Sequence, residues 1–542
     1  MENLLFLLYR KQYLSYYMYQ PLLNMCSDLQ KKILHEFVRK HNVRIRREKM
    51  IRDKVYLDTL MGSKIYLEEA QRDAIVSGAQ AILIGAGAGS GKTTTILAKI
   101  KYMIEKEGVP PSSIALISYT NETVNELKEK LHNQLHYPVC IFTFHTFSLS
   151  LLSEKRKIVV DTKPILQNIL NKMVENYYIK RGLYKIFARF FDGPSFLLPY
   201  ISPSLYESFF YKKGESIWDP LLIYLENKIQ SIRLGTVIYE STKEREFIQY
   251  LFEKYIEYMR KNKMIDFEGM IKEATHFLKY GECSSYYTHL FVDEYQDISY
   301  NRFLLIYEYV TKIRCNICVV GDDFQSIFAF SGSEISLFTD FTNYFKEAEV
   351  YTITKTYRNS QYLIDIAGKF IMKNKKQIHK NLLSDKKEHF PIYLWYYNNN
   401  KISVLEKCIE QLENGRIALL GRYQEDLSFI LESSHFTKVG DEFIYNKRKE
   451  LPLSFLTVHA SKGLGFDSVI LLNMESGKYG FPSERDRDGN EPVLYAEERR
   501  LFYVALTRTK GRIHMLVPRE NSSSFIAEIV KENVGKIVSI RS

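Results

Sequence analysis

The most constraining feature of this chain is a glycine-rich stretch, IGAGAGSGKT, that ends at Thr93. A short apolar run, Ala81–Ile84, leads into it and is typical of a buried strand, and Thr94–Ala98 follows it as the start of a helix. In such a strand–turn–helix, the N–H groups of the turn and the helix N-terminus direct partial positive charge at one point. The stretch therefore predicts a phosphate-binding loop within a parallel α/β domain.

Within this loop, Lys92 is placed to reach the β- and γ-phosphates of a nucleotide, and the Thr93 hydroxyl is placed to bind Mg²⁺. The predicted nucleotide cradle comprises Ala86, Gly87, Ala88, Gly89, Ser90, Gly91, Lys92, Thr93 and Thr94. The strict pattern has glycine where this chain has Ala86, so a glycine-rich loop that binds no phosphate is an alternative on this stretch alone.

A pair of acids follows a second apolar strand, in the stretch Phe291–Asp297. Two carboxylates at a strand end are costly unless a cation lies there. Together with a phosphate loop, Asp293 is expected to hold the Mg²⁺ shell, and Glu294 to orient and deprotonate the attacking water. A solvated acidic turn is the alternative, and the presence of both patterns in one chain disfavours it.

A third polar segment, Val319–Ile327, also follows an apolar strand, and its Gln325 is expected to sense a γ-phosphate by hydrogen bonding. Two arginine-bearing segments lie downstream, Thr356–Ser360 and Glu497–Arg508. An arginine from a second domain can complete such a site, neutralise transition-state charge and link hydrolysis to domain closure.

The length of the chain and its pattern of strands and helices predict more than one domain. The chain has 542 residues, and from Leu67 onward strands alternate with helices. This pattern is lost between about 150 and 265, and it returns near 350 with a strand at Val350–Ile353. Residues 1–66 are basic and helical in character. The predicted division is 1–66 as an N-terminal extension, 67–149 and 266–345 as the two parts of a first domain, 150–265 as a helical insertion, and 346–542 as a second domain.

Composition favours a polyanion partner and a reducing compartment. The net charge of +11 suits nucleic acid, although a solvated basic surface explains it equally well. The six cysteines form no disulfide framework, and the lone pair Cys315 and Cys318 lacks the partners of a zinc site. The apolar run Leu4–Tyr9 is too short for a signal peptide or a membrane span. We therefore expect a cytoplasmic protein that has no membrane partner.

The order of these motifs, from Leu67 to Arg508, resembles that of superfamily 1A DNA helicases of the UvrD/Rep/PcrA group, and most of all the short helicase IV-like type. The resemblance implies two RecA-like P-loop domains that use ATP and Mg²⁺. It also implies 3′→5′ movement on single-stranded DNA and action at single-strand/duplex junctions, in DNA repair or recombination.

The resemblance also assigns roles by position. Gln71 would read the adenine edge, Tyr357 would stack on the adenine, and Arg358 and Arg508 would contact the γ-phosphate. The implied DNA-binding residues are Tyr119, Thr120, Asn121, Thr143, His145, Phe330, Thr457, His459 and Lys462. Aromatic platforms and backbone contacts of this kind suit single strands, since every base has a face that can stack.

Four departures from the family pattern stand out. Thr94 and Ser331 each replace an arginine, and Gly465 replaces a glutamate that is expected to touch the ribose. Rep-like members carry a bulky 2B subdomain, yet only 33 residues (423–455) separate Arg422 from Leu456, too few for an independent core. The 2B subdomain is therefore predicted to be absent or reduced to a hairpin.

Three functional hypotheses remain open from the sequence. The chain is a helicase proper, or a translocase that strips proteins and separates duplex poorly, or a nucleic-acid-stimulated ATPase subunit of a larger, defence-type complex with a nuclease partner. The basic extension fits either a DNA-contacting arm or a partner-docking helix.

Overall fold

A computed structural model describes residues 12–60, 62–152, 157–174, 218–235, 237–239, 242–281, 287–440, 442–484 and 495–541. The apolar run Leu4–Tyr9 lies outside these ranges. The chain divides into two compact units. The first contains residues 1–141, 287–298 and 314–542, and the second contains residues 142–286 and 299–313.

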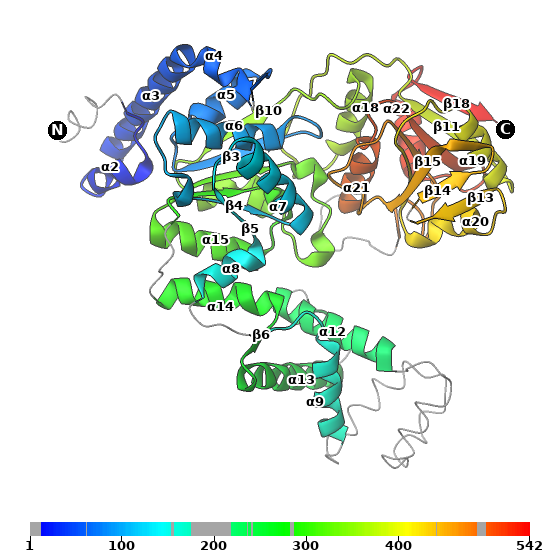
Figure 1. The fold of residues 1–542 in the computed structure, drawn as a ribbon, viewed down its shortest axis with the longest axis horizontal. Coiled ribbons are helices and arrows are strands. Elements are labelled where there is room, and N and C mark those ends of the chain that lie inside the picture. Colours follow the sequence, from blue (N-terminus) through cyan, green and yellow to red (C-terminus); the bar gives the residue numbers. More distant parts are fainter. Residues whose placement is uncertain are drawn as a thin grey trace. The chain divides into compact units, whose positions relative to one another are not determined.

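The first unit holds a six-stranded sheet built from the apolar runs that the sequence singled out (Figure 1). Its order is β10-β3-β9-β8-β4-β5, and β3 pairs in parallel with β9 and β10. A parallel sheet covered on both faces requires continuous apolar strands, and β3 is buried at every residue. The strands are β3 (Ala81–Ala86), β4 (Ile114–Ser118), β5 (Cys140–Thr143), β8 (His289–Val292), β9 (Asn316–Gly321) and β10 (Glu349–Ile353).

The carboxyl ends of β3, β8 and β9 lead directly into the polar motifs. Helix α6 (Lys92–Glu105) follows β3 across the glycine-rich loop, and the acid pair follows β8. Adjacent parallel strands bring their carboxyl ends to one edge of the sheet, where α/β proteins bind their ligands. The order β3-β9-β8 therefore places three motifs that are distant in sequence side by side.

A second, eight-stranded sheet lies in the same unit, with the order β13-β14-β15-β12-β16-β17-β11-β18. Its strands are β11 (Ile392–Tyr397), β12 (Ile417–Gly421), β13 (Phe436–Val439), β14 (Glu442–Tyr445), β15 (Arg448–Thr457), β16 (Ser468–Leu471), β17 (Ile513–Pro518) and β18 (Ile537–Arg541). Its main helices are α18 (Gln361–Ile371), α19 (Lys401–Glu410), α21 (Ala496–Leu506) and α22 (Ser524–Glu532). Both sheets are of the RecA-like kind that the sequence predicted.

The strand at Val350–Ile353 was expected to open the second domain, and this expectation is wrong. Strand β10 pairs with β3 in the first sheet, with Tyr351 opposite Ile84. The side chains of Tyr351 and Ile353 are buried in the core of that sheet. An apolar strand looks the same in either sheet, so its pattern alone could not assign it.

The described residues between Arg422 and Leu456 form no separate domain. A short helix, α20 (Ser428–Leu431), is followed by the antiparallel hairpin β13–β14, and β14 pairs in turn with β15. The hairpin thus extends the second sheet, and β15 continues into Thr457. This arrangement agrees with the prediction that 2B is absent or reduced to a hairpin.

The N-terminal extension is helical, as predicted. It forms α2 (Tyr16–Leu23), α3 (Asp28–Arg52) and α4 (Lys54–Leu57), then the short hairpin β1 (Thr59–Leu60) and β2 (Ser63–Lys64). Figure 1 shows α3 beside α5 (Glu69–Val76), with which it is in contact. Leu57 and Leu60 join the hydrophobic core of the first sheet, so the extension is continuous with that domain.

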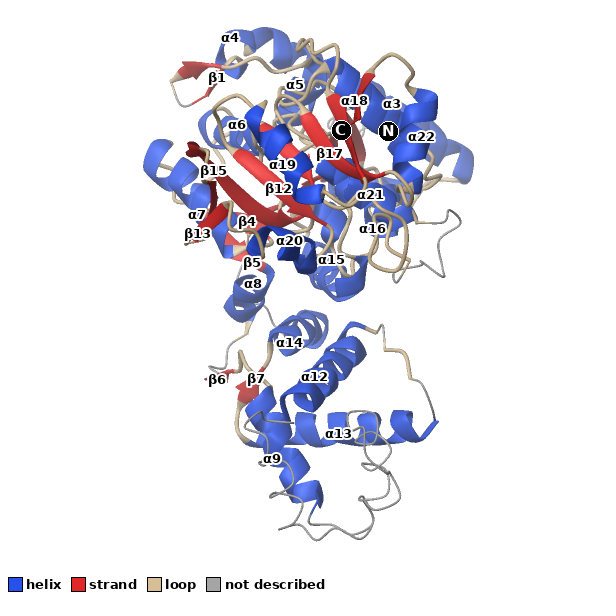
Figure 2. Ribbon diagram, turned by 90° about the vertical axis from the view of Figure 1, so that its right-hand side faces the viewer, coloured by secondary structure: helices blue, strands red, loops and turns tan. Residues whose placement is uncertain are grey.

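The second unit is almost entirely helical (Figure 2). Its elements are α8 (Phe144–Leu151), β6 (Lys157–Ile158), α9 (Lys163–Val174), α12 (Trp218–Leu234), α13 (Thr242–Lys261), β7 (Met264–Ile265), α14 (Phe267–Tyr280) and α15 (Tyr300–Ile313). A core that includes Leu166, Leu225 and Leu251 joins α9, α12 and α13. Among the helices that the structure describes, none is long and apolar enough to span a bilayer.

Candidate nucleotide site and nucleic-acid interface

The glycine-rich loop has the backbone that a phosphate cradle requires. Gly89 and Gly91 adopt left-handed conformations, with φ of +69° and +85°, which glycine adopts without strain. A side chain at Gly89 would also overlap Arg358. Lys92 begins α6 directly after Gly91, with Thr93 and Thr94 in the same first turn, so the orphan N–H groups of that turn face the loop.

Ala86 is compatible with this cradle. It is the last residue of β3, fully buried, and its carbonyl accepts a hydrogen bond of 3.2 Å from Lys380 Nζ. The loop closes beyond it, where Ser90 Oγ donates to the Gly87 carbonyl at 2.9 Å. The departure from glycine thus falls in extended strand, where alanine is well tolerated.

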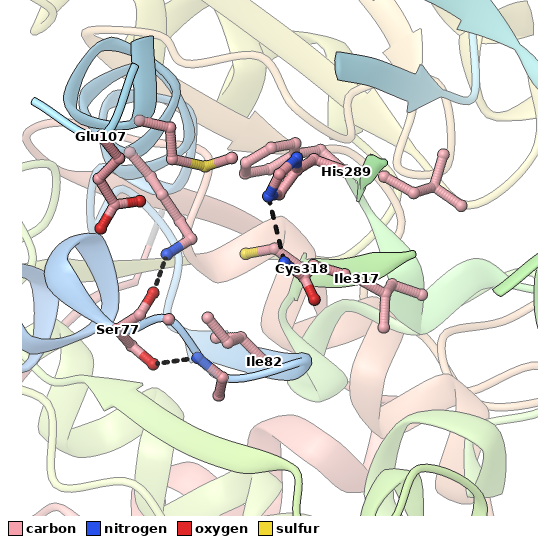
Figure 3. Close-up of a pocket in the computed structure, with 13 residues that line it drawn as sticks. Ser77, Ile82, Glu107, His289, Ile317 and Cys318 are labelled. Carbon is pink, nitrogen blue, oxygen red and sulfur yellow. Dashed lines mark hydrogen bonds between the residues drawn. The ribbon is translucent and has the colours of Figure 1, made fainter. Parts of the chain in front are cut away.

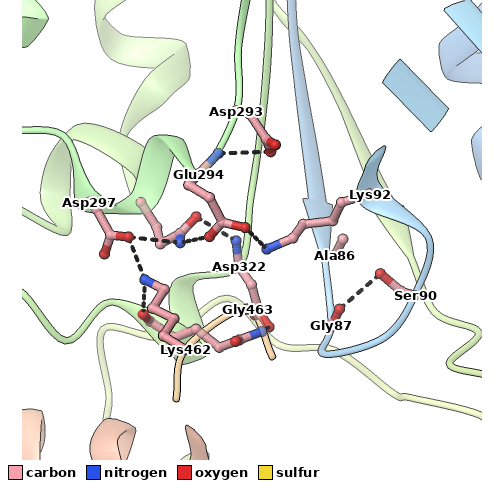
Figure 4. A network of polar contacts seen from close by, with 12 residues as sticks. Ala86, Gly87, Ser90, Lys92, Asp293, Glu294, Asp297, Asp322, Lys462 and Gly463 are labelled. Carbon is pink, nitrogen blue, oxygen red and sulfur yellow. Dashed lines mark hydrogen bonds and ion pairs between the residues drawn. The ribbon is translucent and has the colours of Figure 1, made fainter. Parts of the chain in front are cut away.

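Lys92 and Glu294 face each other across the site (Figure 4), and Lys92 Nζ lies 2.8 Å from Glu294 Oε1. Burial alone would raise the pKa of Glu294, but the Lys92 and Lys462 cations lower it to about 2. The Gln296 side-chain amide also donates to Glu294 Oε2 at 2.5 Å. The carboxylate is therefore ionised and oriented, and at present its partner is the loop lysine.

Asp293 is also buried, and the Lys92 charge acts on it without a direct ion pair among the described residues. Its Oδ1 accepts the Glu294 backbone N–H at 2.9 Å, while burial and the Glu294 charge raise its pKa to about 6. Among the described residues, no cluster of three or more His, Cys, Asp or Glu side chains could hold a metal. Mg²⁺, however, is usually bound by one or two carboxylates together with substrate phosphates. A buried carboxylate at the end of β8, close enough to Lys92 to interact with its charge, fits that ion.

Gln325 connects the first-sheet motifs to the arginines. Its amide N–H donates to Asp322 Oδ2 at 2.6 Å, and its Oε1 accepts from Arg508 at 2.9 Å. Burial and the neighbouring Arg358 lower the pKa of Arg508 to about 9. Two like charges held together in a buried site favour an anion between them.

The residues expected to read the base lie beside this loop. The Tyr357 backbone N–H donates to the Gly89 carbonyl at 3.0 Å, and the Tyr357 ring is 42% exposed. Gln71 is buried, and its amide donates to Thr95 Oγ1, on α6, at 2.8 Å. The structure thus brings Gln71 and Tyr357 to the two sides of the loop.

Lys380 is a functional candidate that the sequence reasoning missed. Its side chain is fully buried and lies 2.7 Å from Asp322 Oδ1, and it also pairs with Asp323. Lys380 follows α18 in a polar segment that gives no sequence signal of burial, since most lysines are exposed. Only the folded chain brings it beneath the loop.

Several candidates for DNA contact in the first unit lie at or after the ends of strands. Phe330 is 70% exposed, and its ring meets the His459 ring edge-on at 5.5 Å. Thr457 ends β15, while Thr120 and Asn121 are exposed at the start of α7 (Asn121–Lys128), directly after the half-buried Tyr119. Ser331, in place of the family's arginine, donates to the Phe328 carbonyl at 2.9 Å.

Lys462 is placed differently from these residues. Its Nζ pairs with Asp297 and donates to the Gln325 carbonyl at 2.7 Å, so it points toward the acid motif that follows β8 (Figure 4). Its side chain is 10% exposed. The motif that carries Thr457 and His459 is thereby tied to the acid motif.

Two candidates belong to the second unit. Thr143 caps α8 by accepting the Thr146 N–H at 3.2 Å. The His145 ring lies 4.7 Å from the Phe267 ring, and burial together with Arg302 lowers the His145 pKa to about 4. Both are therefore neutral polar groups at the start of α8.

A cavity of about 40 Å³ lies at the opposite, amino end of the first sheet, where Ser77, His289 and Cys318 are among the lining residues (Figure 3). The lysine beside it, Lys99, is already occupied, because its Nζ donates to the carbonyls of Ala74 and Ser77 at 2.9 and 2.8 Å. The cavity is too small for a nucleotide and lies away from the carboxyl edge.

These features define the class of the protein as a two-domain P-loop nucleoside triphosphatase: two RecA-like sheets, a phosphate loop, an acid pair at a strand end and converging arginines. The family model of the UvrD/REP helicase N-terminal domain matches residues 67–346, and that of the UvrD-like helicase C-terminal domain matches residues 396–520. The chain belongs to the UvrD/REP helicase family and is an ATP-dependent DNA helicase.

Curated relatives agree with this membership. DNA helicase IV of Escherichia coli K12 is 28% identical over 86% of this chain and 70% of its own length. A putative ATP-dependent DNA helicase of Bacillus subtilis 168 is 25% identical over 72% of this chain and 51% of its own length. A probable DNA helicase of Mycoplasma pneumoniae is 23% identical over 82% of each chain.

Proposed function

We propose that this helicase is a 3′→5′ motor on single-stranded DNA that hydrolyses ATP with Mg²⁺ and acts at single-strand/duplex junctions in DNA repair or recombination. The observation that carries the motor mechanism is one segment, Asp322–Ser331, which holds Gln325 in the nucleotide site and the exposed ring of Phe330 a few residues later. A change at the γ-phosphate therefore moves the proposed base platform directly. The polarity and the pathway rest on the family resemblance.

In the proposed hydrolysis, Lys92 exchanges its partner. The β- and γ-phosphates compete with Glu294 for the Lys92 ammonium, 2.8 Å away. Losing that cation raises the pKa of Glu294 from about 2 toward the range of a general base. Asp293 and Thr93 would hold Mg²⁺, which supplies charge neutralisation at the phosphates.

The arginines would sense the γ-phosphate. Arg508 already donates to Gln325, and Arg358 adjoins the loop at Gly89. An anion between the two relieves their mutual repulsion, so nucleotide binding favours the closed site and hydrolysis weakens it. The Lys462 contact with Asp297 would transmit this change to the loop of Thr457 and His459.

The DNA track is proposed to use stacking in the first unit and polar contacts around it. Phe330 and Tyr119 would hold bases, with Thr120, Asn121, Thr457 and His459 contacting the backbone. Thr143 and His145, which lie in the other unit, stay proposed DNA-binding residues on the family resemblance alone. The proposed division of the chain keeps the domain limits predicted from the sequence with one change: the second domain begins after β10, because this strand belongs to the first sheet.

The hairpin in place of a 2B subdomain favours a second candidate function, translocation with weak duplex separation. Comparing displacement of streptavidin from biotinylated DNA with unwinding of a forked duplex separates the two.

The five cysteines that the structure describes are all free, which supports our proposal of a cytoplasmic, reducing environment.

The decisive experiment compares ATP turnover with single-stranded DNA, duplex DNA and RNA, with Lys92→Ala as control. Strong stimulation by single-stranded DNA is expected. The unwinding of duplexes with 3′ or 5′ tails then tests polarity, and preferential unwinding from a 5′ tail would overturn it. Equal turnover with and without every nucleic acid would overturn the motor proposal.

A further inference from the structure

The N-terminal extension makes a buried polar cluster with the first sheet. Arg46, on α3, places its NH1 2.6 Å from both Glu349 Oε1 and the Tyr351 hydroxyl. Tyr13 also donates to Glu349, and Ser77 Oγ donates to Glu349 Oε2 at 2.6 Å. These charge-assisted bonds in a largely buried setting join three separate parts of the chain.

The electrostatics of this cluster are consistent with a fixed arrangement. Burial alone would raise the pKa of Glu349, yet the hydroxyls of Ser77, Tyr13 and Tyr351 and the Arg46 charge hold it below its ordinary value. The carboxylate is thus ionised, and it depends on the extension for part of its compensation. A buried charge deprived of one partner is costly, so the cluster resists rearrangement.

The cluster holds the carboxyl end of α5, the helix that carries Gln71. Ser77 follows this helix directly, and Asp73 on its last turns lies 3.8 Å from Arg46 Nε. Lys99 of α6 adds hydrogen bonds to the carbonyls of Ala74 and Ser77, at the edge of the cavity in Figure 3.

The amino end of α5 is held by residues that follow β10, the strand that Glu349 begins. Glu68 accepts the backbone N–H groups of Thr354 and Lys355 at 2.6 and 3.1 Å, just beyond β10. Glu349 begins β10 and Thr354 follows it, so one strand anchors both ends of the helix. Gln71 lies between the anchors, 3.5 Å from where a Cβ on Gly91 would be.

We infer that Arg46 and Glu349 are positioning residues, through which the N-terminal extension sets where α5 presents Gln71 to the nucleotide base. The extension then supports the ATP site by positioning α5. It sets the affinity for ATP and the preference among nucleotide bases, in addition to any contact that its outer face makes. This inference rests on the proposed function, since it takes Gln71 as the group that reads adenine.

The test uses the full chain with Arg46→Ala, and measures ATP and GTP hydrolysis with saturating single-stranded DNA. A displaced α5 is expected to raise the KM for ATP by about tenfold, to lower the preference for ATP over GTP in kcat/KM, and to leave kcat close to wild type. Arg46→Lys keeps a cation near Glu349 and is expected to recover most of the affinity.

Arg39→Ala is the matched control, because Arg39 lies on the same helix and, within the described ranges, its ion pair is with Glu36 on the surface. Tyr13→Phe removes a single hydroxyl and serves if Arg46→Ala does not fold. The inference would be overturned if both Arg46→Ala and Tyr13→Phe kept the wild-type KM and the wild-type preference for ATP and showed only a lower Tm. That result would not affect the assignment of Gln71 to adenine. A wild-type protein without preference for ATP over GTP would instead overturn the assignment of Gln71, and the inference with it.

Discussion

Replacing Lys380 by methionine tests the buried charges beneath the loop. The side chains of Lys380, Asp322 and Asp323 are all fully buried, and Lys380 is 2.7 Å from Asp322. Methionine keeps much of the volume but leaves two buried carboxylates without their cation. Breaking a buried pair in this way costs about 3–5 kcal/mol, which is a large share of a domain's stability.

The assay is denaturant unfolding followed by circular dichroism, for wild type, Lys380→Met and the double variant Lys380→Met/Asp323→Asn. The double variant removes one uncompensated charge and is expected to recover a substantial part of the loss. The asparagine amide oxygen can still accept the Ile378 N–H, which now donates to Asp323 Oδ2 at 2.7 Å.

The sign of the pH dependence is fixed by the same geometry. Burial raises the pKa of Asp323, and Lys380 opposes that rise. Without Lys380 the pKa rises further, so the folded state gains protons more readily than the unfolded state as pH falls. The defect of Lys380→Met should therefore shrink between pH 7.5 and pH 5.5. A loss under about 1 kcal/mol, or a defect that grows on acidification, would refute this reasoning.

The remaining predictions concern chemistry, coupling and acid stability. Lys92→Ala should abolish hydrolysis, and full turnover would remove the loop from the mechanism. Glu294→Gln should bind ATP normally and slow turnover by about 10²–10⁴-fold, measured by nucleotide binding beside steady-state kinetics; an unchanged rate excludes Glu294 as the base. Phe330→Ala should reduce stimulation by single-stranded DNA more than basal turnover, and equal losses would mark Phe330 as structural. Burial lowers the pKa of His514 to about 4, and its Nδ1 accepts the Trp395 indole N–H at 3.0 Å. The unfolded state therefore binds a proton first as the pH falls, and the stability of the fold should decrease from about pH 6.5 to pH 4. His514→Gln should reduce this decrease, measured as Tm against pH.

Much of the nucleotide site was predictable because its motifs are local. The glycine-rich loop, the acid pair and Gln325 each follow an apolar strand, and strand ends in a parallel sheet meet at one edge. The shortness of the segment between Arg422 and Leu456 likewise predicted a hairpin, since the number of residues limits the size of a core.

Other features had no local signal. An apolar strand such as β10 fits either sheet, and the lysine at 380 resembles any surface lysine until the fold buries it. The same holds for Lys462, for which the family resemblance implied DNA contact, while its side chain pairs with Asp297 of the acid motif. These contacts join residues far apart in sequence, so spacing does not encode them.

By itself, the sequence determined the class of chemistry, because phosphate binding needs particular residue types at short, fixed spacings around one turn and one strand end. Tertiary structure alone decided which partners those residues have: Lys92 with Glu294, Lys380 with Asp322, and Arg46 of the extension with Glu349. The physical reason is that buried charges are stable only when opposite charges reach them, and which charges meet depends on the packing of the whole domain.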